Sequence, residues 1–371
     1  NGAYEQLIGI GAKNVTIEYS VDGANYQTLG TTHEFAQAPG APDYAHNTTV
    51  DFAGTTAKYV RLTVNSNWGD VFTQYGLSEV RFLYVPTHAR KPYPDSGATD
   101  VDVDVVLTWR AGREAGEHKV YLSTNQQAVT DGTAPVITTT EASHGPLSLE
   151  LGTTYYWRVD EVNDLATPAK WEGDIWSFTT REYLVVDDFE SYNDIPEGEE
   201  GSHLIYETWV DGFGTTTNGS TIGYVEPFQP SMETAIVHSG NQSVPLVYDN
   251  SAAGLSEVTA NVTGLSIGVD WTRGSPQTLM IWFYGDPGNA ITEQMYVKVN
   301  GVKVAYPGDA ADIAETAWRS FDIDLAALGI NLSNVTQLSM GLERTGPNGG
   351  TGIVFIDDIL LYRSAPGIVV P

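Results

Sequence analysis

The sequence predicts an all-β protein made of three consecutive sandwich-like units, the last a jelly roll. Apolar and polar residues alternate along most of the 371 residues, and this period of two is typical of strands with one buried face. Hydrophobic residues make up 41% of the chain and charged residues 18%, which supplies enough apolar mass for buried cores. The 38 glycines and 20 tyrosines fit strands joined by tight turns.

The first predicted unit covers residues 1–86. Val15, Ile17, Tyr19 and Val21 lie on one face of a strand, and the Asp22-Gly23 pair that follows is a hairpin signal. Two further strands are predicted in AKYVRLTVNSNWG and YGLSEVRFLYVP. The three segments, in this order, resemble the C-terminal half of a discoidin-type (coagulation factor type C) domain, with Tyr26 where that family usually has Trp. Because only half of such a module is present, its ligand site is not carried over.

The second predicted unit covers residues 87–181, after the proline-rich segment VPTHARKPYP. Its alternating runs are LTWRAG, HKVYLST, LGTTYYWRVDEVN and WSFTT. These segments resemble the core pattern of a fibronectin type III domain, a family of spacers and docking modules. The resemblance implies a fold and no chemistry.

The third predicted unit covers residues 182–365, and a short apolar tail follows at 366–371. It opens with VVDDFESYND and closes with GIVFIDDILLY, and strands are predicted around Leu279–Phe283, Met295–Val299 and Phe321–Leu325. The two ends resemble the jelly-roll carbohydrate-binding modules, in which the opening and closing strands lie side by side near a structural calcium. The order of the three units resembles the large multi-module surface proteins of planctomycete-type bacteria.

Four acidic residues are the predicted metal ligands of this third unit: Asp188, Glu190, Asp357 and Asp358. If the first and last strands pair, these carboxylates converge, and their repulsion favours a cation such as Ca²⁺, which prefers oxygen ligands. The resemblance places a structural calcium at the same residues. The alternative is that these side chains simply point to solvent on alternate faces.

Aromatic side chains are the predicted sugar-binding residues, because flat rings stack on the C–H faces of pyranoses. The candidates are Trp209, Trp271, Trp282 and Tyr284. Trp282 and Tyr284 share the strand face opposite to Leu279 and Ile281, while the two other tryptophans lie in loop-like contexts, which favours exposure. Each ring is alternatively a core residue.

Charge and composition exclude several functions. The net charge of −29 disfavours binding to nucleic acids and anionic lipid, and no apolar run reaches the length of a transmembrane helix. The absence of cysteine excludes disulfides, thiolate zinc sites and a cysteine nucleophile. No HExxH, GxSxG or P-loop motif is present, and no carboxylate pair stands out, so we expect no enzyme.

We therefore expect a non-catalytic extracellular or cell-surface protein whose last unit binds a glycan or polysaccharide. The alternative is a structural subunit that binds other copies of itself in a surface layer or filament. The start at Asn1, without Met or signal peptide, suggests a mature form or a fragment. For self-assembly, Ile368–Val370 is the candidate added strand, and the burial of Leu7, Ile8 and Ile10 is the test.

Overall fold

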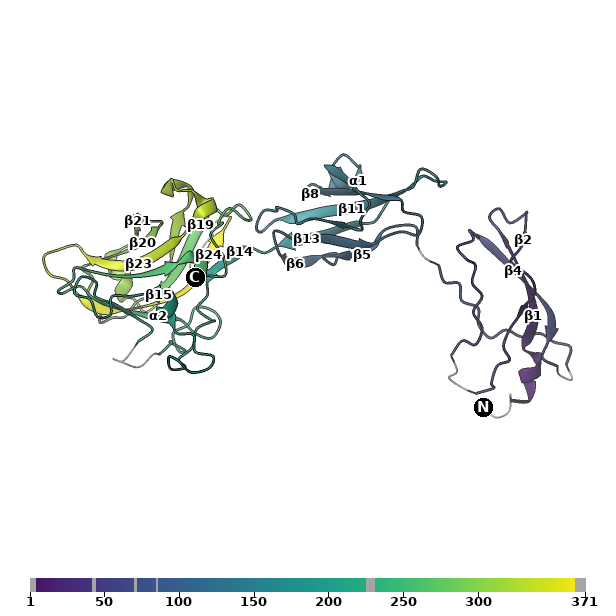
Figure 1. The fold of residues 1–371 in the computed structure, drawn as a ribbon, viewed down its shortest axis with the longest axis horizontal. Coiled ribbons are helices and arrows are strands. Elements are labelled where there is room, and N and C mark those ends of the chain that lie inside the picture. The colour runs from purple at the N-terminus through teal and green to yellow at the C-terminus, as the bar shows by residue number, and fades with distance from the viewer. Residues whose placement is uncertain (1–4, 42–44, 70–71, 85, 225–230, 364–371) are drawn as a thin grey trace. The chain divides into compact units, whose positions relative to one another are not determined.

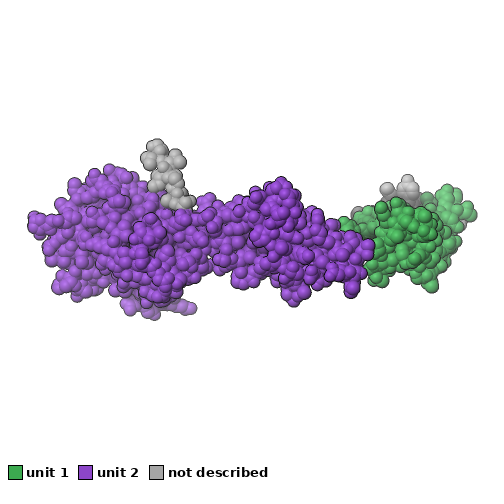
Figure 2. All heavy atoms as spheres, turned by 90° about the horizontal axis from the view of Figure 1, so that it is seen from above, with its two compact units in different colours: residues 1–84 green, residues 85–371 purple. Residues whose placement is uncertain are grey.

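The structure is a computed structural model, and it describes residues 5–41, 45–69, 72–84, 86–224 and 231–363. The described chain is almost entirely β, as the sequence predicts. It divides into two compact units, Asn1–Tyr84 and Val85–Pro371, coloured separately in Figure 2. None of the helices in the described ranges has the length and apolar character needed to cross a bilayer.

The first unit is a small sheet around one central strand. β1 (Ala12–Ser20) pairs on one side with the short strands β2 (Gln27–Thr28) and β3 (His33–Glu34), and on the other with β4 (Tyr59–Asn67). The antiparallel pairing of β1 with β2 confirms the hairpin predicted at Asp22-Gly23. Tyr26, the residue at the usual Trp position, lies 3.7 Å from the Arg61 guanidinium and stacks on it.

The predicted third strand of this unit is wrong. The segment 77–84 forms no strand, and its apolar side chains are exposed, Leu83 at 91% and Tyr84 at 80%. A strand needs a backbone partner along its length, and the pairing that the structure gives nearby is the single bridge between Gly76 and Gly11, just before this segment.

The first described residues, which form a short helix, pack on their own unit. The short helix η1 (Glu5–Ile10) is followed by backbone hydrogen bonds between Ile10, Ala12 and Gly76. Leu7, Ile8 and Ile10 are consequently half-buried. The other part of the self-assembly test, Ile368–Val370, lies outside the described residues.

The second unit begins with a two-sheet sandwich. Its strands and short helix are β5 (Arg90–Tyr93), β6 (Ala98–Val101), β7 (Leu107–Arg110), β8 (Glu117–Ser123), α1 (Gln126–Thr130), β9 (Val136–Thr139), β10 (Ser143–His144), β11 (Thr154–Val162), β12 (Lys170–Trp171) and β13 (Ile175–Thr180). The sheet β10-β7-β5 faces the sheet β6-β13-β11-β8-β9, to which β12 also pairs (Figure 1). Trp109, Trp157 and Trp176 pack edge to face in the core, with ring centroids 6.3 and 4.7 Å apart.

The C-terminal sandwich consists of two sheets. The first, here called the β19 sheet, has the order β16-β17-β24-β19-β22, with β14 paired to β24. The second, the β23 sheet, has the order β15-β18-β23-β20-β21. The bounds are β14 (Tyr183–Asp187), β15 (Trp209–Val210), β16 (Ser220–Ile222), β17 (Val244–Asp249), β18 (Leu255–Asn261), β19 (Thr278–Tyr284), β20 (Glu293–Val299), β21 (Val302–Ala305), β22 (Trp318–Asp324), β23 (Gln337–Arg344) and β24 (Thr351–Tyr362).

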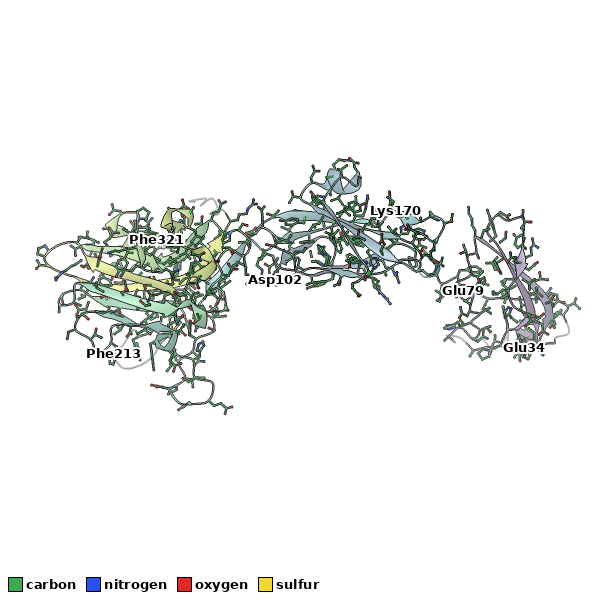
Figure 3. All side chains as sticks on the ribbon, turned by 45° about the horizontal axis from the view of Figure 1, so that its top comes forward. Glu34, Glu79, Asp102, Lys170, Phe213 and Phe321 are labelled. Carbon is green, nitrogen blue, oxygen red and sulfur yellow. The ribbon has the colours of Figure 1, made fainter. Side chains whose placement is uncertain are left out.

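Short helices connect these strands at α2 (Ile205–Thr208), η2 (Val262–Gly264), η3 (Ala310–Ala314), η4 (Ala326–Leu328) and η5 (Leu332–Asn334). Alternate residues of β19 and β22, such as Leu279, Ile281 and Phe321, are fully buried between the two sheets. Figure 3 shows Phe321 among the strands of this sandwich. The predicted strands of the third unit are thus confirmed in type and in their inward-facing residues.

The opening and closing strands of the C-terminal sandwich lie side by side, as the sequence predicts. β14 pairs antiparallel with β24, from Tyr183 opposite Tyr362 to Asp187 opposite Ile359. β24 also pairs with β19, where Ile281 lies opposite Ile359 and Trp282 opposite Asp357. Asp358 is therefore an extra residue, and its φ of 42° marks a β-bulge at this point.

Candidate functional site

The candidate site is the outer face of the β19 sheet. Trp282 and Tyr284 alternate with buried core residues of β19, so both side chains point away from the core. The register places Ser320 opposite Trp282 and Trp318 opposite Tyr284. Trp282, Tyr284 and Trp318 are all partly exposed. Three aromatic rings of two adjacent strands therefore gather on one surface.

A histidine from a distant loop completes this surface. The His238 ring stacks on Trp282, with centroids 4.0 Å apart and an interplanar angle of 19°, and its edge faces Trp318 at 5.5 Å. Tyr284 packs against Trp318 at 5.5 Å. We call the surface formed by Trp282, Tyr284, Trp318 and His238 the aromatic face.

The bulge in β24 holds His238 in place. The His238 Nδ1–H donates to Asp358 Oδ2 at 2.6 Å, and the Ser239 hydroxyl donates to Asp358 Oδ1 at 3.0 Å. The backbone N–H groups of His238 and Ser239 donate to Asp357 Oδ2 at 2.9 and 3.3 Å. Because the bulge brings two consecutive carboxylates under one turn, both can bind the same pair of residues.

The rest of segment 238–242 binds the opening strand region. Glu190 accepts from the Asn241 backbone N–H at 2.8 Å, the Asn241 amide at 3.0 Å and the Gln242 N–H at 3.1 Å. The Gln242 amide donates to the carbonyls of Phe189 and Tyr192. Segment 238–242 therefore joins the opening region of the sandwich to its closing strand through hydrogen bonds.

The carboxylates in this region differ in their proton affinity. Burial raises the pKa of Asp357 to about 6, and the neighbouring charge of Asp358 adds to this effect against the opposing hydrogen bonds from His238 and Ser239. Burial also acts to raise the pKa of Glu190, but the hydrogen bonds from Asn241 and Gln242 outweigh it and leave that pKa below its usual value.

Two of the predicted sugar-binding residues are core residues instead. Trp209 and Trp271 are 0% exposed, so the prediction that they offer rings to a ligand is wrong. The Trp209 indole N–H donates to the buried Asp187 at 2.8 Å, and that of Trp271 donates to the Gly268 carbonyl at 3.2 Å. Both rings can be buried because each indole N–H has an acceptor, in the core for Trp209 and in the preceding turn of its own loop for Trp271.

The predicted calcium ligands come together but do not form a ligand cluster. Glu190, Asp357 and Asp358 are bound to donors of segment 238–242, and Asp188 accepts from the Glu190 N–H at 3.2 Å. Among the described residues, no group of three or more His, Asp or Glu side chains is arranged to hold a metal ion. The residues present therefore do not fit a cation in this arrangement, and calcium stays a prediction from the sequence.

The two sheets of the sandwich differ in charge. The six strands of the β19 sheet contain six aspartates, one arginine and no lysine. That arginine, Arg319, is bound to Asp312 and Glu315. The strands of the β23 sheet contain three glutamates and three basic residues, and Lys298 and Lys303 pair with Glu257 and Glu343. The β23 sheet is thus neutralised, whereas the β19 sheet is anionic.

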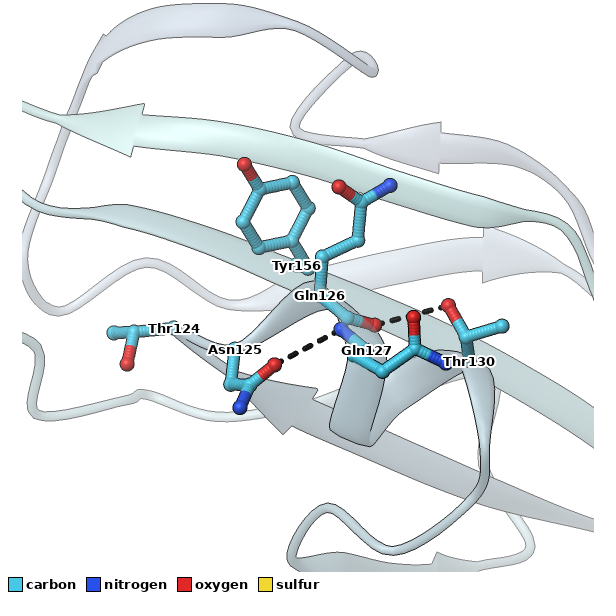
Figure 4. A pocket seen from close by; sticks show the side chains of 6 residues that line it. All are labelled: Thr124, Asn125, Gln126, Gln127, Thr130 and Tyr156. Atoms are coloured by element: carbon cyan, nitrogen blue, oxygen red, sulfur yellow. Dashed lines mark hydrogen bonds between the residues drawn. The ribbon is translucent and has the colours of Figure 1, made fainter.

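A cavity of about 630 Å³ lies elsewhere, beside α1 in the middle sandwich (Figure 4). It is lined by Thr124, Asn125, Gln126, Gln127, Thr130 and Tyr156. The Asn125 side chain caps α1 by accepting from the Gln127 N–H at 3.0 Å, and Thr130 bonds to the Gln126 carbonyl. Its polar groups therefore serve the local helix, and we assign it no function.

Two residues of the aromatic face were not among the predicted site residues. Trp318 starts the strand that pairs with β19, and its alternation with Phe321 and Ile323 is a signal that places it on the outer face. His238 lies in a loop with no periodicity, and the sequence carries no comparable signal for it.

Comparison with known proteins gives no family. No family model matches the chain, and no curated protein matches it in sequence. The first solved structures found include a β-1,2-glucanase from Parabacteroides distasonis and an exo-β-agarase, and the chain spans only 24% and 26% of their lengths. Sequence identity to these two is 14% and 13% over 42% and 50% of this chain, with TM-scores of 0.28 and 0.32.

Similar solved structures also include glycan-binding modules. A carbohydrate-binding module specific for non-crystalline cellulose is 15% identical, with a TM-score of 0.25 over 36% of this chain and 79% of the module. A protein from a xyloglucan utilization locus of Bacteroides uniformis is 12% identical, with a TM-score of 0.26 over 71% of this chain and 96% of that one. At these scores the likeness carries no argument about function, which depends on the site itself.

Proposed function

We propose that the C-terminal sandwich binds a polysaccharide on its aromatic face, as a non-catalytic module of an extracellular or cell-surface protein. The observation that carries the proposal is the gathering of Trp282, Tyr284, Trp318 and His238, all partly exposed, on one sheet face. Aromatic rings cost energy when they face water, so a cluster of them outside the core points to a ligand. Pyranose rings present flat C–H faces that suit such a surface.

The pre-formed geometry of the face supports binding. His238 is fixed by Asp358 and by backbone bonds to Asp357, so Trp282 is held by a stacked neighbour before any ligand arrives. A surface ordered in advance loses less conformational entropy on binding. The β23 sheet, whose charged side chains pair with each other, has the character of an ordinary solvated surface.

The proposal that the module is non-catalytic rests on its carboxylates. Glycoside hydrolysis needs two carboxyl groups about 5–10 Å apart on either side of the scissile bond. Asp357 and Asp358 are consecutive residues, and both are bound to His238 and Ser239 on the same side of the sheet. They are therefore positioning residues for the histidine. Asp322 lies on the other side of β19, but because both oxygens of Asp358 are bound by His238 and Ser239, we do not assign these two carboxylates the roles of a hydrolytic pair.

The experiment is a glycan array with the full chain, followed by calorimetry on the glycans that bind. Trp318→Ala is expected to weaken binding at least about tenfold, or about 1.4 kcal/mol. Tyr84→Ala, which removes an 80% exposed aromatic ring from the first unit, is the matched control and should leave the affinity unchanged. Equal affinity of the Trp318 variant and the parent chain, or the absence of any saturable glycan binding, would refute the proposal.

A second candidate function is self-association through the first unit. The exposed segment 77–84 has no strand partner, and among the described strands β4 pairs only with β1. A second copy supplies both an apolar extended segment and a free strand edge, which is the combination that β-strand addition requires. Sedimentation equilibrium tests this: Phe82→Ser with Leu83→Ser should abolish a concentration-dependent oligomer, and a monomeric parent chain would exclude it.

A further inference from the structure

We infer that the aromatic face selects glycans by charge: it binds a chain with ammonium groups more tightly than a neutral chain, and a neutral chain more tightly than one with carboxylates. The inference rests on the proposed function and names the class of glycan that the same face takes. It follows from the distribution of charge over the two sheets of the sandwich.

The acidic residues near the aromatic face are placed by the strand register. Asp322 follows Trp318 and Ser320 on the same face of β22 and lies opposite Met280, one position along the face from Trp282. Asp357 and Asp358 lie on the other side of β19, next to Trp282. Burial raises the pKa of the Tyr362 hydroxyl to about 12, the neighbouring Tyr183 adds to this, and the charges of Asp358 and Asp322 make smaller contributions. Aspartates therefore flank the rings on both sides.

Compensating positive charge is absent from the described strands of this sheet, apart from Arg319. The Arg319 guanidinium is already bound to Asp312 and Glu315. By alternation along β22, Arg319 also shares the strand face of the core residue Phe321, which is opposite to the face of Trp318. His238 is the remaining base at the aromatic face, and its Nδ1–H is directed at Asp358. Among the described strands of this sheet and His238, a carboxylate or sulfate on a bound glycan would meet no free cation.

The size of the effect follows from Coulomb's law. Two unit charges about 7 Å apart in a water-like dielectric change an affinity about two- to threefold. Asp322 and Asp358 acting together thus shift the affinity about four- to ninefold for each ligand charge near Trp282 at low ionic strength. Salt should reduce this factor, because the Debye length falls from about 30 Å at 0.01 M to about 10 Å at 0.1 M.

The test compares three chains of one linkage: the neutral glycan that binds best in the array, its C6-oxidised form, and its 2-amino form. At 0.02 M NaCl we expect the oxidised chain to bind at least about fourfold more weakly than the neutral chain and the amino chain at least about fourfold more tightly. Both differences should shrink in 0.5 M NaCl. Equal or tighter binding of the oxidised chain, or differences that do not depend on salt, would overturn the inference.

Two variants separate a local effect from the net charge of −29. Asp322→Asn should reduce the ratio of the affinities for the neutral and the oxidised chain by about two- to threefold, and the affinity for the neutral chain should not fall. Glu343→Gln, on the β23 sheet, removes the same charge and should leave the difference unchanged. Equal effects of the two variants would also overturn the inference. Failure of every glycan to bind refutes the proposed function instead, so the two failures are distinguishable.

Discussion

Replacing Asp357 by Asn should change the pH dependence of stability of the C-terminal sandwich in a defined direction. Asp357 is 0% exposed, and burial raises its pKa to about 6. Its Oδ2 accepts two backbone N–H groups of segment 238–242. Asparagine has nearly the same shape and keeps one oxygen acceptor for these donors, but it carries no charge.

The sign and size follow from linkage between protonation and folding. A carboxyl whose folded pKa is raised contributes stability that is fully present below its unfolded pKa, near 3.8, and is lost as the pH rises through about 6. A difference of about two pKa units corresponds to about 3 kcal/mol. The free energy of unfolding of Asp357→Asn, minus that of the parent chain, should therefore rise by up to about 3 kcal/mol between pH 4 and pH 7.

The assay is urea unfolding of fluorotryptophan-labelled full chain, read from the ¹⁹F signals of Trp209 and Trp271, which are buried in this sandwich. Asp249→Asn is the control on the same sheet: hydrogen bonds from Ser251 lower the pKa of Asp249, so its effect on the pH dependence of stability lies mainly below about pH 4. The difference in the free energy of unfolding between Asp249→Asn and the parent chain should therefore stay nearly constant from pH 4 to pH 7. A difference for Asp357→Asn that stays flat or falls from pH 4 to pH 7 would refute the reasoning.

Three further predictions concern the same sandwich. Gly240→Ala should lower the free energy of unfolding by about 1–3 kcal/mol more than Gly198→Ala does. Both glycines have a positive φ, but only at Gly240 would the new Cβ lie 2.3 Å from the Glu190 carboxylate. Denaturant unfolding of both variants measures this difference. Because donors of segment 238–242 already bind Glu190 and its neighbouring carboxylates, excess chelator should leave the melting temperature unchanged, and a drop would support the calcium site predicted from the sequence. Trp271→Ala should cost about 3–5 kcal/mol of stability, whereas Trp318→Ala should cost less than about 1.5 kcal/mol, and similar losses would contradict the division into core and binding residues.

The fold could be predicted where alternation and turn chemistry act locally. Leu279, Ile281 and Phe321 are buried as their spacing indicates, and the Asp22-Gly23 hairpin forms as expected. Prediction failed at segment 77–84, whose composition suits a strand. Composition decides whether a segment tolerates extended backbone, whereas strand formation also needs a partner strand that lies alongside the segment, which depends on the arrangement of the whole unit.

The site could be predicted only in part. Trp282 and Tyr284 follow from alternation, whereas the burial of Trp209 depends on an acceptor, Asp187, that is 22 residues away. The position of His238 depends on Asp358, 120 residues later in the chain, and on a bulge that turns this carboxylate to the outer face. Contacts of such long range leave no periodic trace in the sequence.

The pairing of β14 with β24 has a mechanical consequence. Tyr183 and Tyr362, the outermost residues of this strand pair, lie opposite each other, so the first residue of β14 and the last residue of β24 lie at one corner of the sandwich. Tension applied through these two residues would break the β14–β24 hydrogen bonds one after another, because the strands are pulled apart from one end. It would not load all of these hydrogen bonds at the same time, as a shear force along the strands would. The contacts of segment 238–242 with Glu190 and Asp357 lie beyond the first pairs to open, so they would be the next to resist the pull.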